Sequence, residues 1–168
     1  MHVDRYERAW MRLSAAALAV FLVAIVVAAF AWGIQLPGVY ARIDPNTLYD
    51  AGSPFADPTV RELAPGKYEA YVRAQIWQFT PREIRIPAGS SITFYVTSQD
   101  VQHGFNVAGT NINMMVLPGQ ISTLTATFDE PGTYNFICHE YCGQLHQTMY
   151  GQIIVEEAAG EEVAQSGE

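Results

Sequence analysis

The sequence predicts an all-β domain that is joined to one N-terminal transmembrane helix. Three observations indicate this fold class: an uncharged apolar segment near the N-terminus, several short runs in which apolar and polar residues alternate, and Pro-Gly pairs between those runs. Alternation with a period of two is typical of half-buried strands, and short strands separated by turns favour a sandwich or a barrel. No helical period follows the first segment, so we expect an antiparallel arrangement of these strands.

The N-terminal segment has the length and composition of a membrane anchor. From Leu13 to Trp32 there are 20 residues without a charged side chain. As a helix they span about 30 Å, which is the thickness of the hydrocarbon core of a bilayer. Arginines precede the segment, so the positive-inside rule predicts a single-pass protein of the plasma membrane with a cytoplasmic N-terminus and an outer, periplasmic domain. A cleaved signal peptide is the alternative, because residues 29–31 read Ala-Phe-Ala.

The strands are expected between Tyr68 and Val155, where alternating and β-branched runs are separated by turns. One of these runs places Tyr134, Phe136 and Cys138 on the same face. The sequence therefore predicts four parts: a cytoplasmic stub and transmembrane helix at 1–34, a Pro-, Gly- and Asp-rich tether at 35–66, the β-domain at 67–156, and an acidic disordered tail at 157–168.

Composition excludes several classes of protein. The chain has 9 basic and 17 acidic side chains and a formal net charge of −8, which argues against a nucleic-acid partner because such proteins need a basic surface. With 15% charged and 12% aromatic residues it is not disordered throughout. No Ser-His-acid set or phosphate-binding glycine loop is evident, so we expect no catalytic residue in this chain itself.

Metal-ligating side chains are concentrated in the twelve residues from Cys138 to Met149. Cys142 follows the first cysteine by four positions, and His146 follows Cys142 by four. Thiolate and thioether ligands select copper or iron–sulfur clusters, and imidazole suits copper and zinc. A second histidine, His103, follows a predicted strand and can reach the same cluster from a neighbouring loop.

Four other interpretations of this cluster are open at this point. The two cysteines can form a disulfide, although so short a loop demands unusual geometry. Two cysteines and two histidines can hold structural zinc, which leaves Met149 unexplained because a thioether is a poor zinc ligand. A mononuclear blue-copper site leaves Cys142 without a role. Met149 by itself can be an ordinary core residue.

The run C-x3-C-x3-H-x2-M, preceded by a Pro-Gly-x-Tyr turn and a strand, resembles the copper A loop of cytochrome c oxidase subunit II. The resemblance implies a cupredoxin-like Greek-key β-barrel that holds a binuclear copper A centre, in which two thiolates bridge two copper ions. A single membrane helix is similar to the smaller, B-type branch of the family. Carried over position by position, the expected metal ligands are His103, Cys138, the backbone carbonyl of Glu140, Cys142, His146 and Met149.

This resemblance also implies a function and partners. The chain is expected to be the electron-transfer subunit of a membrane terminal oxidase, an oxidoreductase complex of the respiratory chain that reduces oxygen to water and pumps protons. Its expected partners are the haem-copper subunit I, further small membrane subunits, and cytochrome c or a small copper protein as electron donor. The alternatives are the copper A subunit of a nitric-oxide reductase and a membrane-anchored mononuclear blue-copper carrier.

Three further positions follow from the same resemblance. The family carries an aromatic pair over which the donor delivers electrons, and here Gln75 replaces one member, so Trp77 is the expected electron-accepting residue. His139 occupies a position without a ligand, and in an extended strand its side chain points to the face opposite Cys138. We therefore expect His139 to be a surface residue. In the family, the side chain at Glu140 contributes to a magnesium site shared with subunit I.

Overall fold

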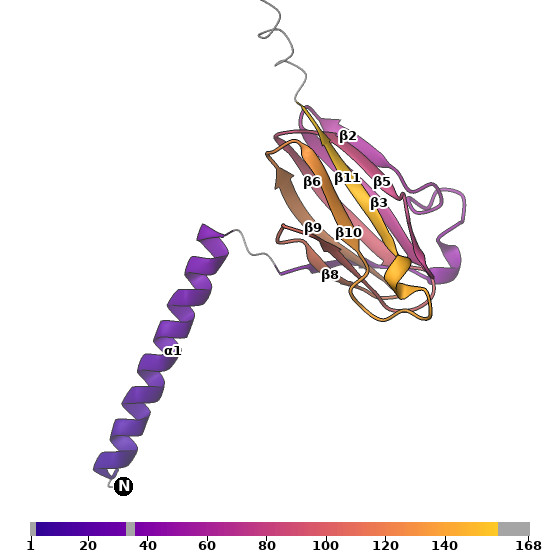
Figure 1. Ribbon diagram of the computed structural model, residues 1–168. Helices are drawn as coiled ribbons and strands as arrows, with labels where there is room; N and C mark the ends of the chain where they lie inside the picture. The colour runs from indigo at the N-terminus through magenta and orange to yellow at the C-terminus, as the bar shows by residue number, and fades with distance from the viewer. Residues whose placement is uncertain (1–2, 33–35, 158–168) are drawn as a thin grey trace, which may run out of the picture. The chain divides into compact units, whose positions relative to one another are not determined.

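The structure is a computed structural model that describes residues 3–32 and 36–157. The chain divides into two compact units, Met1–Gln35 and Leu36–Glu168, which are a long helix and a β-domain (Figure 1). The predicted disordered tail at 157–168 lies, except for Glu157, outside the described residues.

Helix α1 (Arg5–Ala31) has the surface of a membrane-spanning helix. It begins at Asp4, whose side chain accepts a hydrogen bond from the backbone N–H of Tyr6, and none of its residues is buried. A helix that is apolar on all sides needs an apolar environment around it. Among residues 3–32 and 36–157 it is the one helix long and apolar enough to cross a bilayer. This agrees with a membrane anchor in the place that the sequence predicts.

The β-domain consists of two sheets (Figure 1). In the first sheet the strand order is β1 (Gly38–Arg42), β9 (Gln120–Phe128), β6 (Ser90–Ser98), β3 (Lys67–Gln75) and β2 (Val60–Ala64), with β4 (Gln78–Thr80) also paired to β3. In the second it is β5 (Glu83–Pro87), β11 (Tyr150–Glu156), β10 (Gly132–Ile137), β7 (His103–Val107) and β8 (Asn113–Val116). The predicted class, an all-β cupredoxin-like Greek-key barrel with one N-terminal helix, is confirmed.

Two strand pairs correct the expectation of an antiparallel arrangement. β6 runs parallel to β3, and β11 runs parallel to β5, whereas the other pairs in the described residues are antiparallel. The prediction failed here because side chains alternate between the two faces with a period of two in parallel and in antiparallel strands alike. The chain passes through β4 and β5 between β3 and β6, and this return through the other sheet permits the parallel pairing.

The main hydrophobic core lies between the sheets. Both sheets contribute to it, and aromatic rings of Phe79, Phe94, Phe105 and Phe136 contact one another at its centre, with centroids 5.0–5.6 Å apart. The core is continuous with the two cysteines and the methionine of the predicted metal site, all of which are buried. The fold thus provides a rigid apolar floor beneath that site.

The segment expected as a tether contains β1, β2 and the short 3-10 helix η1 (Pro45–Thr47). Its side chains Leu48 and Phe55 are fully buried and form a second small core with Ile121 of β9. The Arg73 guanidinium of β3 secures the segment, because it donates a hydrogen bond to the carbonyl of Phe55 and lies 4.2 Å from the ring centroid of Tyr49. Residues 38–64 are therefore packed onto the first sheet.

Candidate metal centre

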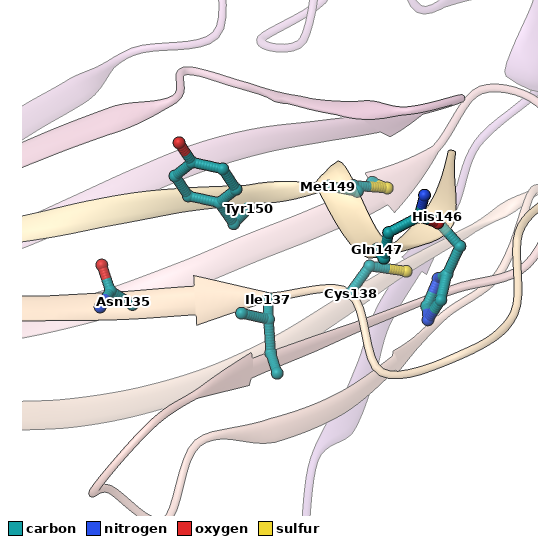
Figure 2. Close-up of a pocket in the computed structure, with 7 residues that line it drawn as sticks. All are labelled: Asn135, Ile137, Cys138, His146, Gln147, Met149 and Tyr150. Atoms are coloured by element: carbon teal, nitrogen blue, oxygen red, sulfur yellow. The ribbon is translucent and has the colours of Figure 1, made fainter. Parts of the chain in front are cut away.

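A closed loop joins strands β10 and β11 and carries most of the predicted ligands. The backbone N–H of Cys138 donates to the carbonyl of Met149 at 3.1 Å, so the two ends of the loop lie side by side. Between them, the 3-10 helix η2 (His146–Thr148) places His146 beside the sulfur atoms. Figure 2 shows the sulfurs of Cys138 and Met149 directed toward the side on which His146 lies.

The donor atoms form two sets, one around each cysteine sulfur. Cys138 Sγ lies 3.8 Å from His103 Nδ1 and 3.2 Å from the carbonyl oxygen of Glu140. Cys142 Sγ lies 3.5 Å from His146 Nδ1 and 3.7 Å from Met149 Sδ. The two sulfurs are 3.8 Å apart, and both cysteines are free thiols rather than a disulfide. Each sulfur thus has one imidazole nitrogen and one weaker donor beside it.

His103 reaches the centre from a distant part of the sequence, because it is the first residue of β7. Its side chain is fully buried, and Nε2 lies 2.8 Å from Asp100 Oδ1. A carboxylate can only accept, so Nε2 carries the proton and Nδ1 presents its lone pair to Cys138. Burial disfavours the charged ring, but the contacts with Cys138 and Asp100 outweigh it and raise the pKa of His103.

The two thiols differ strongly in acidity. Burial opposes ionisation of Cys138, but its contact with His103 and backbone hydrogen bonds at Gly104 and Glu140 lower its pKa to about 6. For Cys142, burial and the adjacent Cys138 charge raise the pKa to about 12. Ionisation of both thiols is therefore unfavourable without a nearby cation, and thiolate, thioether and imidazole ligands together favour a soft metal such as copper.

His139 does not join the donor set. Its ring lies across Gly104, where an added Cβ would come within 2.6 Å of the ring, and its side chain is 26% exposed. Nδ1 is 3.7 Å from Glu140 Oε1, and Nε2 is buried without a hydrogen-bond partner among the described residues. The alternation of strand faces predicted a surface residue. The structure corrects this, because His139 is half-buried against β7.

Trp77 lies next to the centre although it is far from Cys142 in the sequence. An added Cβ on Gly143 would come within 2.9 Å of Trp77 Nε1, so the indole covers the residue that follows Cys142. Gly143 has φ +122, a conformation that favours glycine, and this permits the close approach. The indole thus fills the space between this part of the loop and the turn after β3.

Asp100 lies beside the proposed ligands, and the sequence did not single it out. Its carboxylate contacts His103, yet the sequence offers only an acidic residue three positions before a candidate ligand, which is too common a pattern to single out. The contact depends on the bend after β6, and only the structure shows that bend.

A set of thiol, thioether and imidazole donors, buried except for the partly buried His146, at one end of a cupredoxin-like barrel defines a copper-binding electron-transfer protein. Residues 69–158 match the family model described as cytochrome c oxidase subunit II, periplasmic domain. The chain belongs to the cytochrome c oxidase subunit II family.

Similar proteins agree with this assignment over most of the chain. A cytochrome c oxidase subunit 2 of Thermus thermophilus is 45% identical over 156 residues, which are 90% of this chain and 92% of the relative. A second Thermus thermophilus cytochrome c oxidase subunit 2 is 46% identical over 127 residues, covering 74% and 93% of the two chains. A chain of a heme-copper terminal oxidase dimer solved by cryo-EM is 34% identical with a TM-score of 0.74, covering 90% of this chain and 100% of that one.

The predicted function is therefore confirmed at the level of the family. The chain is an electron-transfer subunit of a terminal oxidase, so it is part of an oxidoreductase complex. It is a copper-binding, membrane-anchored subunit whose β-domain corresponds to the family's periplasmic domain, and other subunits of a haem-copper oxidase are its partners.

Proposed function

We propose that the chain holds a binuclear copper A centre. The ligands are the two bridging thiolates, one imidazole for each copper and one weaker donor for each: His103, Cys138, the carbonyl of Glu140, Cys142, His146 and Met149. The observation that carries this proposal is the division of the donors into two sets, one around each of two sulfurs that are 3.8 Å apart. A single four-coordinate metal uses only part of this set and leaves the remaining donors without a role.

Two copper ions that share two sulfurs can carry one electron with little change in bond lengths. The protein supports this by holding its ligands rigidly and by burying the sulfur atoms. Cys138 and Cys142 are 5% and 6% exposed, and Met149 is 2% exposed. The core beneath them lowers the local dielectric, and the strands prevent relaxation of the ligands.

Electrons are proposed to come from cytochrome c or a small copper protein, to pass through Trp77, and to leave for the haem of subunit I, where the complex reduces oxygen and pumps protons. The indole of Trp77 touches Gly143, directly after Cys142, and it is only partly buried. Ile76 beside it is 45% exposed, which offers apolar surface for a donor at this point. The nitric-oxide reductase and blue-copper alternatives gain no support from these contacts.

The copper domain is proposed to lie on the outer side of the plasma membrane, with the N-terminus in the cytoplasm. Arg5, Arg8 and Arg12 precede the apolar part of α1, as the positive-inside rule requires. Protease added to spheroplasts should digest the β-domain, and protease added to inverted vesicles should not. The reverse pattern would overturn this orientation.

Rapid mixing with a reduced donor tests electron transfer itself. The copper-loaded full chain should be reduced by reduced cytochrome c, and Trp77→Ala should slow this reduction about tenfold while the visible spectrum of the centre stays unchanged. Tyr40→Ala is the matched control, because Tyr40 is an exposed aromatic residue on β1 (64% exposed). Failure of the loaded chain to accept electrons would overturn the proposed function, and equal rates for the two variants would overturn the role of Trp77.

A further inference from the structure

Asp100 connects three segments of the domain through one carboxylate. Oδ1 accepts hydrogen bonds from His103 Nε2 at 2.8 Å and from the backbone N–H of Val101 at 2.7 Å. Oδ2 accepts from the backbone N–H of Ile76 at 2.7 Å. The carboxylate therefore joins the loop after β6, the start of β7, and the turn between β3 and β4 that carries Trp77.

We infer that Asp100 is the positioning residue of the copper centre on its His103 side. The inference rests on the proposed function, because it takes His103 Nδ1 as a copper ligand. By accepting a hydrogen bond from Nε2–H, the carboxylate fixes both the tautomer and the orientation of the ring, so that Nδ1 faces Cys138 Sγ. A carboxylate on the far nitrogen also makes an imidazole a stronger electron donor to its metal.

Because His103 is buried, its hydrogen bond to Asp100 determines the orientation of the ring. His103 is fully buried, and its ring contacts Asp100 through Nε2 and Cys138 through Nδ1. Water cannot replace the carboxylate at a buried nitrogen without a change in the structure around it. Without Asp100, the ring loses the contact that distinguishes its two nitrogens.

The backbone of the same loop is held by other groups, which allows the two roles to be separated. Ser98 Oγ accepts from the backbone N–H of Asp100 at 3.2 Å and donates to the carbonyl of Val101 at 2.5 Å. Its contact with Asp100 Oδ1 is longer, at 3.4 Å, than the 2.8 Å contact of that oxygen with His103. Gln99 N–H donates to the carbonyl of Ala74 at 3.0 Å. Replacing Ser98 therefore disturbs the loop without removing the carboxylate from the His103 ring.

An asparagine at position 100 cannot accept from all three donors of the carboxylate, because His103 and Val101 contact one oxygen and Ile76 contacts the other. It offers one carbonyl oxygen, and its NH2 group then faces either His103 Nε2–H or the backbone N–H of Ile76. Asp100→Asn should therefore weaken the centre less than Asp100→Ala, which removes every acceptor. Removing a negative charge and an electron-donating contact favours the reduced centre, so both substitutions should raise the reduction potential.

The test compares Asp100→Asn, Asp100→Ala and the control Ser98→Ala in the full chain in detergent, loaded with copper. Copper affinity is measured by competition with a chelator, and the reduction potential and visible spectrum are recorded for each. Asp100→Ala should weaken copper binding roughly 10–100-fold and raise the potential, with Asp100→Asn intermediate and Ser98→Ala at the potential of the unaltered chain. Thermal unfolding of each variant identifies any that do not fold. If Asp100→Ala does not fold, the copper affinity and potential of the near-isosteric Asp100→Asn test the inference.

Two outcomes would overturn the inference. One is a potential and a copper affinity that stay unchanged in both Asp100 variants, and the other is an equal shift in Ser98→Ala, which would show a merely structural role. An unaltered chain that binds no copper would overturn the proposed function itself. The rate of reduction by dithionite provides a further readout. In Asp100→Ala the rate of reduction by cytochrome c should fall more than the rate of reduction by dithionite. The reason is that the turn that carries Trp77 loses its hydrogen bond to the same carboxylate.

Discussion

The proposed ligands come from two regions that are built very differently. His103 stands at the start of strand β7, is fully buried, and is fixed by Asp100. The other five donors lie in one loop, Cys138–Met149, whose ends are joined by a backbone hydrogen bond and whose histidine lies on a one-turn 3-10 helix. We call these regions the strand arm and the loop arm.

The comparison shows that the sheet fixes the position of one ligand, whereas the residues of the loop determine the chemistry of the others. The strand arm is part of the sheet, so its ligand is placed by long-range packing and by a hydrogen bond to a neighbouring loop. The loop arm supplies the thiolates and the thioether, and residue spacing within twelve positions determines its chemistry. Changes to the scaffold should therefore affect both arms, whereas changes within the loop should alter the metal and spare the fold.

Removing the segment before β3 should have the largest effect, because β1 and β2 flank the first sheet of the scaffold. A fragment that begins at Leu36 keeps both strands, and one that begins at Lys67 loses them together with Leu48 and Phe55, each fully buried. Loss of these two side chains alone costs about 3–6 kcal/mol, which is comparable with the whole stability of a small domain. Urea unfolding followed by circular dichroism should show a cooperative transition only for the longer fragment, and equal midpoints would contradict this expectation.

Within the loop arm, Cys142→Ser should remove one of the two bridging thiolates of the proposed binuclear centre. A hydroxyl is a much poorer bridging ligand than a thiolate, so the variant should bind at most one copper per chain and lose the spectrum of a binuclear centre. Because the substitution is nearly isosteric, the unfolding midpoint of the metal-free variant should stay close to that of the unaltered chain. Retention of two coppers with an unchanged spectrum would show that Cys142 does not bridge.

The two histidines of the loop arm should differ sharply. His146→Ala removes the imidazole nitrogen 3.5 Å from Cys142 Sγ, so copper binding or the visible spectrum should be lost or distorted. His139→Ala should keep two coppers and near-normal electron transfer, because its ring lies on Gly104 rather than among the donors. Metal content and spectra of the two variants, measured side by side, decide the assignment, and a reversed result would contradict it.

Gly104→Ala should produce the smallest of these effects. The new Cβ would lie 2.6 Å from the His139 ring, and displacing the ring costs about 1–3 kcal/mol. In the double variant with His139→Ala this cost should disappear, which a double-mutant cycle of unfolding free energies measures directly. Additive effects of the two substitutions would show that the ring is not what restricts this position.

Much of the loop arm could be predicted because its information is local. Cys138, Cys142, His146 and Met149 are close in sequence, and in the closed loop their donor atoms lie together. The transmembrane helix could also be predicted, because 20 consecutive uncharged residues are enough to indicate it. The alternation of apolar residues identified the strand-forming region and the all-β class.

The strand arm was less accessible to sequence reasoning because it depends on contacts between distant residues. His103 was placed by resemblance, but its partner Asp100 and the shared contact with Ile76 require the bend after β6. Parallel pairing of β3 with β6 leaves no mark on the alternation pattern. Leu48 and Phe55 lie in a Pro-, Gly- and Asp-rich segment whose composition resembles a linker, although they form a second core.

Copper stoichiometry combined with electron paramagnetic resonance tests the central claim most directly. The copper-loaded full chain should contain two coppers, and its spectrum should show one unpaired electron shared equally between both nuclei. A single copper per chain with the electron localised on one nucleus would contradict the binuclear centre, and so would one zinc in place of copper.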